Sequence, residues 1–349
     1  MSFENLRKLA KHAAHRTAPE NYSVETVDAA FAGELKKFCS NINEFMKNRY
    51  DLYQIIIENV DDIVPQNVID ALSVVAEVRV VPQGQKVTFK KSVGKNRARK
   101  FLTQVGLSGV YETFRLDKST FDVTPIAIGG AVTIDFERML DNEETLPEVM
   151  EIITEGMEDS VFGEVQRALK GAMNAQGRPQ VNKASNVFVA ADMQKLCTIA
   201  KAYGGGSAVI LAPPEFIDAM GPTAIVPGSA GNYQGIYHPE DIDNIYRTGR
   251  IKMFYGTPII EIPQSFTDES NTTTWIDPQF AYILPAGKSK VVKVVFEGQT
   301  QINDFKNRDN SLEVHTYRKL GVAILSHHDW CIYQNTGIPQ TMVNPYGTD

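Results

Sequence analysis

The stretch TLPEVMEIITEGMEDSVFGEVQRALKGA, residues 145–172, is the clearest structural signal in the chain. Its apolar residues return at every fourth position: Val149, Ile153, Met157, Val161, Val165 and Leu169. This spacing places them on one face of a helix, and Thr145 and Glu148 form a capping box at its start. A helix from Leu146 to about Ala172 would be roughly 40 Å long at about 1.5 Å per residue. Tertiary or quaternary packing must hold so long a helix straight.

The other side of this helix is acidic. The acidic residues that could meet a partner there are Glu148, Glu151, Glu155, Glu158 and Asp159. A solvated face is the commonest role of such a run of charges, and contact with a basic partner is the functional alternative. Gly156 and Gly163 lower the intrinsic helix propensity by about 1 kcal/mol each, which again points to packing as the source of stability.

Upstream of this helix the apolar period changes from four to two. Residues 77–80, 86–90 and 113–117 alternate between apolar and polar, and no acid occurs over 78–111. This pattern predicts a long two-stranded hairpin with a basic tip. The basic residues of the tip are Lys86, Lys90, Lys91, Lys95, Arg97, Arg99 and Lys100. An isolated hairpin is marginal in water, so we favour docking on the acidic helix of a neighbour over a solvated loop or a nucleic-acid patch.

The N-terminal region carries a second helical stripe. Its members, spaced by three or four residues, are Val27, Phe31, Leu35, Phe38, Ile42 and Phe45. Such a stripe packs on its own core or serves as an arm on a neighbouring chain. Beyond the central helix, strand and helix patterns alternate over 186–284, which is typical of a compact α/β unit. Strands are expected again at 290–296 and 312–325.

Composition excludes several classes of protein. The chain has 349 residues, 43% hydrophobic content and a net charge of −7, which fits about two folded units and disfavours nucleic-acid binding over the whole surface. Its cysteines, Cys39, Cys197 and Cys331, form no CxxC pair. The N-terminus lacks the apolar core of a signal peptide, and no segment has the length of a membrane span. We therefore expect a soluble intracellular product.

The motifs of catalysis fail when tested. Residues 287–289 resemble the end of a P-loop, but Tyr282 stands where the first glycine is required. Residues 205–209 resemble half of a nucleophile elbow, and Val209 replaces its second glycine. His327 and His328 are adjacent, so on a strand they point to opposite faces. No catalytic, cofactor or metal site is predicted.

The order of these elements resembles the major capsid protein of tailed bacteriophages, which has the α+β Hong Kong 97-type fold. The hairpin resembles that family's extended E-loop, and the helix at 145–172 resembles its spine helix. The stretch GRIKMFYGTPII at 249–260 is similar to the family's G-hydrophobic-G-x-P-hydrophobic run. The resemblance implies an N-terminal arm with lead-in helices at 1–76, an E-loop at 77–125, a peripheral domain at 126–185 and 285–349, and an axial domain at 186–284.

The function implied by this resemblance is mechanical. A major capsid protein self-assembles as hexamers and pentamers into an icosahedral shell around double-stranded phage DNA; it is not an enzyme and needs no cofactor. Expected partners are its own copies, a separate scaffolding protein, a portal, decoration protein and the packaged DNA, bound without sequence specificity and without a membrane. Its place would be the virion, after assembly in the host cytoplasm. Two alternatives are an encapsulin-like nanocompartment shell protein and a soluble α/β enzyme with its site near the 221–237 loop.

Overall fold

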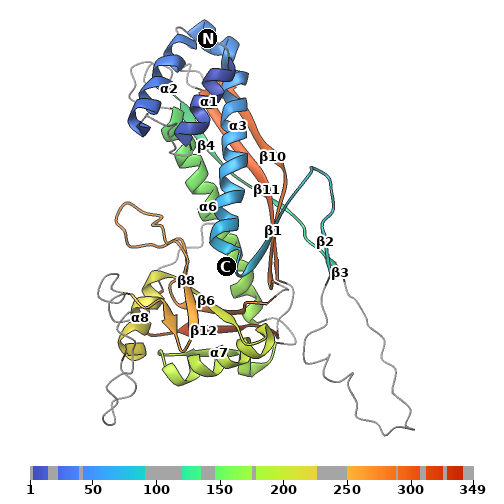
Figure 1. Cartoon of the computed structure of the whole chain (residues 1–349), viewed down its shortest axis with the longest axis vertical. Coiled ribbons are helices and arrows are strands. Elements are labelled where there is room, and N and C mark those ends of the chain that lie inside the picture. The colour runs from blue at the N-terminus through green and yellow to red at the C-terminus, as the bar shows by residue number, and fades with distance from the viewer. Residues whose placement is uncertain are drawn as a thin grey trace, which may run out of the picture.

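The protein is elongated, with a helix-and-sheet part at one end and a second sheet flanked by helices at the other (Figure 1). A two-stranded hairpin projects to one side of this body. The computed structural model describes residues 3–14, 23–38, 42–90, 120–134, 146–174, 178–225, 250–287, 290–306, 312–324 and 328–340.

Three helices form the N-terminal part: α1 (Phe3–Ala14), α2 (Val24–Phe38) and α3 (Ile42–Leu72). The stripe predicted over 27–45 is therefore divided between α2 and α3. Most of α3 was missed by the sequence analysis, although its local signal is as regular as that of the central helix. The buried residues that recur at every fourth position along it are Leu52, Ile56, Val60, Val64, Val68 and Leu72.

A four-stranded sheet lies beside α3. Its strands, in spatial order, are β1 (Ala76–Val81), β10 (Val292–Lys306), β11 (Leu312–Ile324) and β4 (Ile126–Ile134). β1 runs parallel to β10, and the other two pairs are antiparallel. Helix α3 and the long helix α6 (Leu146–Gly171) pack against this sheet (Figure 1). The bounds of α6 confirm the helix predicted from residue 146 onward.

The predicted hairpin is present at its base. β2 (Thr88–Lys90) pairs antiparallel with β3 (Thr120–Asp122), while residues 91–119 lie outside the described residues. The strand at 77–80 does not belong to this hairpin, because β1 pairs with β10 in the four-stranded sheet. The described hairpin therefore begins after β1, because alternation identifies a strand but not its partner; an E-loop at 77–125 stays a prediction.

A six-stranded sheet forms the other end of the molecule. Its strands, in spatial order, are β5 (Lys183–Asn186), β12 (Cys331–Asn335), β9 (Phe280–Pro285), β6 (Ala208–Ala212), β8 (Thr257–Glu261) and β7 (Met253–Phe254). Two helices, α7 (Ala190–Gly204) and α8 (Pro214–Ile225), pack on it, and short 3₁₀ turns occur at Ala172–Asn174 and Gln180–Asn182.

Two details of this sheet correct the sequence analysis. β12 lies between β5 and β9, so the C-terminal segment assigned to the peripheral domain contributes a strand to the sheet of the predicted axial domain. The first strand of this sheet in the sequence lies at 183–186, whereas the α/β pattern was expected to begin only at residue 186. The local sequence does not determine the position of β12 or of β5, because each depends on which distant strand it pairs with.

The largest hydrophobic core is continuous between the two ends. It joins buried residues of α3 and α6 to both sheets, including Val294 of β10 and Tyr282 of β9. A second cluster lies under α7 and α8, and a small third one lies under the hairpin base. The long helix α6 is thus the element that both sheets share.

Candidate assembly surfaces

The apolar stripe of α6 is buried within its own chain. Ile153, Met157, Val161, Val165 and Leu169 are each at most 7% exposed, whereas the side chain of Val149 lies outside the described residues. The flank that remains open carries the exposed acids Glu151 and Glu155. Ile152 lies between them and is 62% exposed. The open flank is therefore an acidic surface with an apolar centre.

Glu158 and Asp159 are engaged inside the chain. Asn67 Nδ2 of α3 donates a hydrogen bond to Glu158 Oε1 at 2.6 Å. Burial raises the pKa of Glu158 and of Asp159, against lowering contributions from the hydrogen bonds of Asn67 and Ser265 respectively. Of the five acids predicted for this surface, Glu151 and Glu155 are exposed and Glu158 and Asp159 are partly buried; the side chain of Glu148 is not described.

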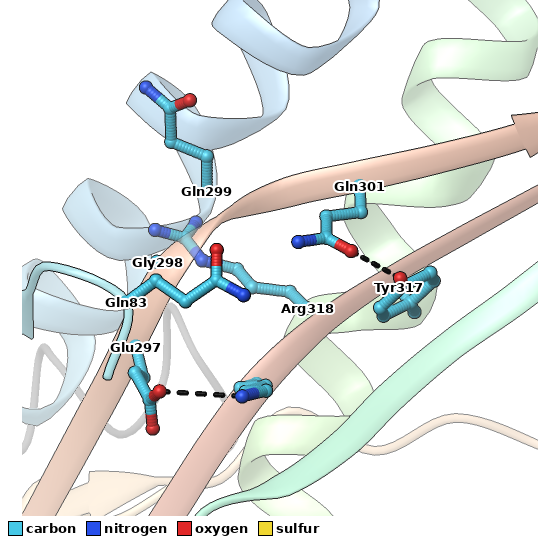
Figure 2. A pocket seen from close by; sticks show the side chains of 8 residues that line it. Gln83, Glu297, Gly298, Gln299, Gln301, Tyr317 and Arg318 are labelled. Carbon is cyan, nitrogen blue, oxygen red and sulfur yellow. Dashed lines mark hydrogen bonds and ion pairs between the residues drawn. The ribbon is translucent and has the colours of Figure 1, made fainter.

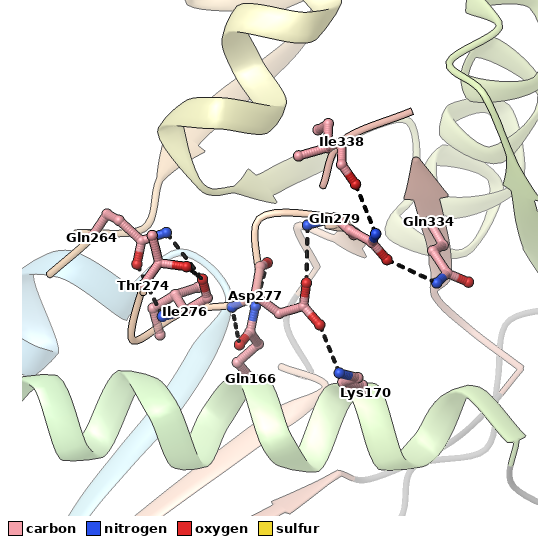
Figure 3. Close-up of polar contacts among 9 residues, drawn as sticks. All are labelled: Gln166, Lys170, Gln264, Thr274, Ile276, Asp277, Gln279, Gln334 and Ile338. Atoms are coloured by element: carbon pink, nitrogen blue, oxygen red, sulfur yellow. Dashed lines mark hydrogen bonds and ion pairs between the residues drawn. The ribbon is translucent and has the colours of Figure 1, made fainter. Parts of the chain in front are cut away.

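A polar strip joins α6 to the six-stranded sheet (Figure 3). Gln166 Nε2 donates to the backbone oxygen of Asp277 at 3.0 Å, and the backbone N–H of Asp277 donates to Gln166 Oε1 at 2.9 Å. Lys170 Nζ lies 2.6 Å from Asp277 Oδ2, and Asp277 is fully buried. Because buried peptide groups need partners, this strip fixes the helix relative to the second sheet.

The strip continues from Asp277 toward the C-terminus. The backbone N–H of Gln279 donates to Asp277 Oδ1 at 3.1 Å, and its side-chain Nε2 donates to the backbone oxygen of Ile338 at 2.7 Å. Gln334 Nε2 donates in turn to Gln279 Oε1 at 3.1 Å (Figure 3). Sequence reasoning missed these residues. The usable signal was Gln166 itself, an amide beside the apolar stripe of an amphipathic helix.

The hairpin base packs on its own sheet. Val87, Phe89 and Val123 of the hairpin form a small buried cluster with Val295 of β10. The hairpin, expected to need a partner chain for support, thus has local support at its base. The described base therefore needs no neighbouring chain for its support.

Charged groups surround the buried Phe89 ring. The guanidinium of Arg79 lies 4.6 Å and the ammonium of Lys293 lies 5.3 Å from the ring centroid, distances that suit cation–π attraction. Both cations also donate to the carboxylate of Glu77. Burial alone would raise the pKa of Glu77, but these hydrogen bonds outweigh it and hold the pKa below its ordinary value.

Lys86 is engaged at the base of the hairpin. Its Nζ lies 3.2 Å from Asp122 Oδ2, and Thr88 Oγ1 donates to Asp122 Oδ1 at 2.9 Å. The bonds from Thr88 and Lys86 hold the pKa of Asp122 below its usual range. Lys90 is in β2, with a side chain that is not described. The remaining basic residues of the predicted tip lie outside the described part of the chain: Lys91, Lys95, Arg97, Arg99 and Lys100.

A β-bulge in β10 contacts the segment between β1 and β2, where the chain leaves the four-stranded sheet for the hairpin. The register of β10 against β11 shifts between Glu297 and Gln301, and Glu297 accepts a hydrogen bond from the backbone N–H of Gly84 at 2.9 Å. Figure 2 shows Glu297, Gln83 and Gln301 around a small pocket beside the buried Arg318. The hydrogen bond between Gly84 and Glu297 thus holds the segment that connects β1 to the hairpin against β10.

Asp61 of α3 forms hydrogen bonds and an ion pair with residues of the bulge and of β11. Its Oδ1 accepts from the backbone N–H and Oγ1 of Thr300 at 3.0 and 2.6 Å and lies 3.1 Å from Nη1 of Arg318. Burial lowers the pKa of Arg318, and the charge of Asp61 opposes that change. Asp61 thus links the bulge in β10 to helix α3 and to strand β11.

The N-terminal stripe packs within the chain where it is described. Val27 is 4% exposed and Phe31 is fully buried, while the side chains of Leu35, Phe38, Ile42 and Phe45 lie outside the described residues. Lys11 Nζ of α1 lies 2.7 Å from Asp62 Oδ2 of α3. Val27 and Phe31 are therefore covered by their own chain, which fits the first of the two roles expected for the stripe; a role of the stripe as an arm stays a prediction.

The described residues contain no group of three His, Cys, Asp or Glu side chains that could hold a metal ion. Within the same ranges, no helix combines the length and the apolar character needed to cross a membrane. Cys197 and Cys331 are buried free thiols, and burial raises the pKa of Cys331 to about 12. Most of the 221–237 loop, where an enzyme site was considered, lies outside the described residues.

A long helix shared by two sheets, an acidic open flank and a projecting hairpin are the features of a capsid-shell protein of the phage type. The chain belongs to the family described as "SPbeta prophage-derived putative capsid protein YonB", which matches residues 5–329. The family match confirms the recognition as a phage capsid protein and the location in a virion, and the described residues show the predicted α+β architecture.

No curated protein sequence matches the chain significantly. Among solved structures, a satellite phage P4 procapsid that includes the size determination protein is 11% identical, with a TM-score of 0.49, over 81% of this chain and 90% of that one. The Gordonia phage Cozz structure is 11% identical, with a TM-score of 0.47, over 76% and 85%. The encapsulin SrpI of Synechococcus elongatus is 12% identical, with a TM-score of 0.43, over 77% and 88%.

Proposed function

We propose that copies of this chain assemble as hexamers and pentamers into an icosahedral shell that encloses double-stranded DNA. The observation that carries this proposal is the family match, which extends over residues 5–329. The acidic flank of α6 supports it, because Glu151, Ile152 and Glu155 are exposed there and so accessible to a neighbouring chain. The net charge of −7 suits a container for a polyanion, since a strongly basic lining would adsorb the genome.

The contact between neighbours joins the basic hairpin tip of one copy to the open flank of α6 in the next. On the helix the contact uses Glu151 and Glu155, whose carboxylates are exposed, and the adjacent Glu148. On the hairpin it uses the basic run that includes Lys95 and Arg97. A single exposed ion pair contributes only about 0–1 kcal/mol. The strength of the contact therefore comes from many such pairs repeated around a closed shell.

The domain roles follow from the same proposal. The hairpin beyond β1 serves as the E-loop and α6 as the spine helix. The four-stranded sheet belongs to the peripheral domain, and the six-stranded sheet, with β12 included, belongs to the axial domain. A separate scaffolding protein, a portal and a decoration protein act as further partners. None of these roles requires a cofactor.

Negative-stain electron microscopy of the purified protein tests the proposal. The wild-type chain should form closed shells, tubes or ring-shaped hexamers, and a small fixed oligomer would refute a shell function. Reversing Lys95, Arg97 and Arg99 to Glu should prevent shell closure while the circular dichroism of the subunit stays unchanged. Normal shells from this triple variant would refute the docking of the hairpin tip.

A charge swap identifies the surface that receives the tip. Glu151→Lys and Glu155→Lys together, added to the triple variant, should restore closed shells because the signs of the two surfaces are then exchanged. The matched control is Asp51→Lys together with Asp70→Lys, which reverses two exposed acids of α3 and should not restore assembly. If both sets of changes restored closed shells equally, assembly would depend on the total charge of the subunit and not on the acidic flank of α6.

A further inference from the structure

β4 is an edge strand without the usual protection against pairing. It spans nine residues, IAIGGAVTI, with no charged residue and no proline. On one side it pairs with β11 along its whole length. No strand among the described residues pairs with its other side. Long, uncharged edges of this kind are templates for strand addition from another chain.

The other sheet edges in the described part of the chain are short or charged. β1, at the opposite edge of the same sheet, has six residues and carries Glu77 and Arg79. β5 has four residues and begins with Lys183, and β7 has two residues. These are the devices by which proteins block edge-to-edge pairing. Their absence from β4 indicates that this edge is covered in the assembled state.

The sequence of β4 is nearly symmetric about Gly130, which indicates what covers it. One step from Gly130 lie the small residues Gly129 and Ala131. The matching pairs at two, three and four steps are Ile128 with Val132, Ala127 with Thr133, and Ile126 with Ile134. Antiparallel pairing of two identical strands about Gly130 therefore sets β-branched residues opposite β-branched residues on one face and small residues opposite small ones on the other.

We propose that β4 pairs antiparallel with β4 of a second copy across a twofold axis at Gly130, which joins the two four-stranded sheets into one. The inference rests on the proposed shell and names one of its contacts. A twofold contact uses the same patch on both subunits, as a symmetric strand requires. It also places the side chain of Ile126, 47% exposed in the single chain, beside Ile134 of the partner subunit. Side chains at such cross-strand positions stabilise a sheet through direct contact.

Gly130 is suited to a direct test. A Cβ atom added there meets no atom within 4 Å, whereas at Gly129 it would lie 2.7 Å from the Tyr317 Cα atom. In the proposed register, the two Gly130 Cα atoms are about 4.5–5.5 Å apart, within the range that a disulfide spans. The two Ala127 Cα atoms would be roughly 20 Å apart, since six residues separate them along the strands.

The experiment compares Gly130→Cys with the control Ala127→Cys, both in a Cys39→Ser background that keeps the buried Cys197 and Cys331. Purified protein is assembled, oxidised mildly and resolved on a non-reducing gel. Gly130→Cys should give at least about tenfold more disulfide-linked dimer than Ala127→Cys. Equal yields from particles of normal appearance would overturn β4 pairing and leave the proposed shell intact.

A second variant tests the proposed β4–β4 contact without oxidation. Ala131→Lys places a charge at the proposed contact and should leave rings or small oligomers in place of closed shells, with the circular dichroism spectrum unchanged. Normal shells from Ala131→Lys would also overturn the pairing. Failure of the wild-type protein to form any large assembly would instead refute the proposed function. The yield of the Gly130→Cys dimer would then still report on β4 pairing by itself.

Discussion

Gly163 lies where the indole of Trp275 crosses α6. A Cβ atom at this position would lie 2.7 Å from Trp275 Nε1 and 3.2 Å from its Cε2. The same Nε1 donates to the backbone oxygen of Asp159 at 2.8 Å. This glycine therefore contributes space for a tertiary contact, which outweighs its low helix propensity. Gly156 has no atom within 4 Å of the corresponding position, so it makes no comparable contribution.

The two glycines should respond oppositely to alanine. Gly163→Ala should destabilise the protein by about 1–3 kcal/mol, because the indole must move out of a packed site. Gly156→Ala should stabilise it by up to about 1 kcal/mol through helix propensity alone. Thermal unfolding followed by circular dichroism measures both changes. Equal midpoints for the two variants would contradict the packing role of Gly163.

The carboxyl groups of Glu158 and Glu77 have pKa values displaced in opposite directions. Burial raises the pKa of Glu158 above 4.5, so its charged form disfavours the folded state increasingly as pH rises through the folded pKa. Hydrogen bonds from Lys293 and Arg79 overcome burial and lower the pKa of Glu77 below 4.5. The stabilising effect of Glu77 is therefore present above pH 4.5 and is lost as pH falls through its folded pKa.

These signs predict opposite effects of two amide substitutions. Glu158→Gln should raise the unfolding midpoint at pH 7 and lose that advantage near pH 4, where the native carboxyl is protonated. Glu77→Gln should lower the midpoint at pH 7, because it leaves the buried Lys293 ammonium without its carboxylate. That loss should shrink near pH 3. Midpoints measured across this pH range give both differences, and effects of the same sign at pH 7 would refute the assignment.

At the scale of elements, the hairpin divides into a supported base and a tip that extends beyond it. The base has its own small core, in which Phe89 is 3% exposed and packs with Val123 and Val295. This arrangement localises the proposed assembly contact to residues beyond the base.

Phe89→Ala should release the hairpin base while the rest of the protein stays folded. Loss of a buried phenylalanine costs about 3–5 kcal/mol, which exceeds what so small a cluster can retain. Amide hydrogen exchange should accelerate at least about tenfold over 87–90 and 120–123 and stay unchanged in α7. The control is Val80→Ala, which truncates a side chain that is 53% exposed on the neighbouring strand β1. Unchanged exchange at the base would contradict this division.

At the scale of the whole molecule, the two ends are not separate units along the chain. The six-stranded sheet is completed by β12, which returns from beyond the four-stranded sheet to lie between β5 and β9. Residues 330–333 are all fully buried. The polar strip from α6 to Asp277 and the shared hydrophobic core connect the same two ends. We therefore expect the two sheets to depend on each other for stability.

A truncation tests this dependence. A chain that ends after Asp329 lacks Trp330 and the whole of β12, and each large buried side chain contributes about 2–5 kcal/mol. The sum is comparable with a typical total stability of about 5–15 kcal/mol, so the near-UV circular dichroism of a folded protein should be lost. A chain that ends after Gln340 retains β12 and should keep that signal. Retention of native structure by the shorter chain would show that the sheets fold independently.

The sequence by itself determined the features whose signals are local. The four-residue period predicted α6, alternation with turn residues predicted the hairpin, and the order of these elements indicated the capsid family. The same kind of signal was available for α3 at 52–72. Local periods suffice here because one face of each element must be buried, whatever covers it.

Only the tertiary structure decided which elements lie together. It placed β1 in a sheet and not in the hairpin, and it brought β12 into the other sheet. It also partly buried Glu158 and Asp159 and placed Gly163 against Trp275. These outcomes depend on contacts between residues up to about two hundred positions apart, as in the pairing of β1 with β10. A strand pattern is satisfied equally by several partners, so geometry in three dimensions selects the one that is used.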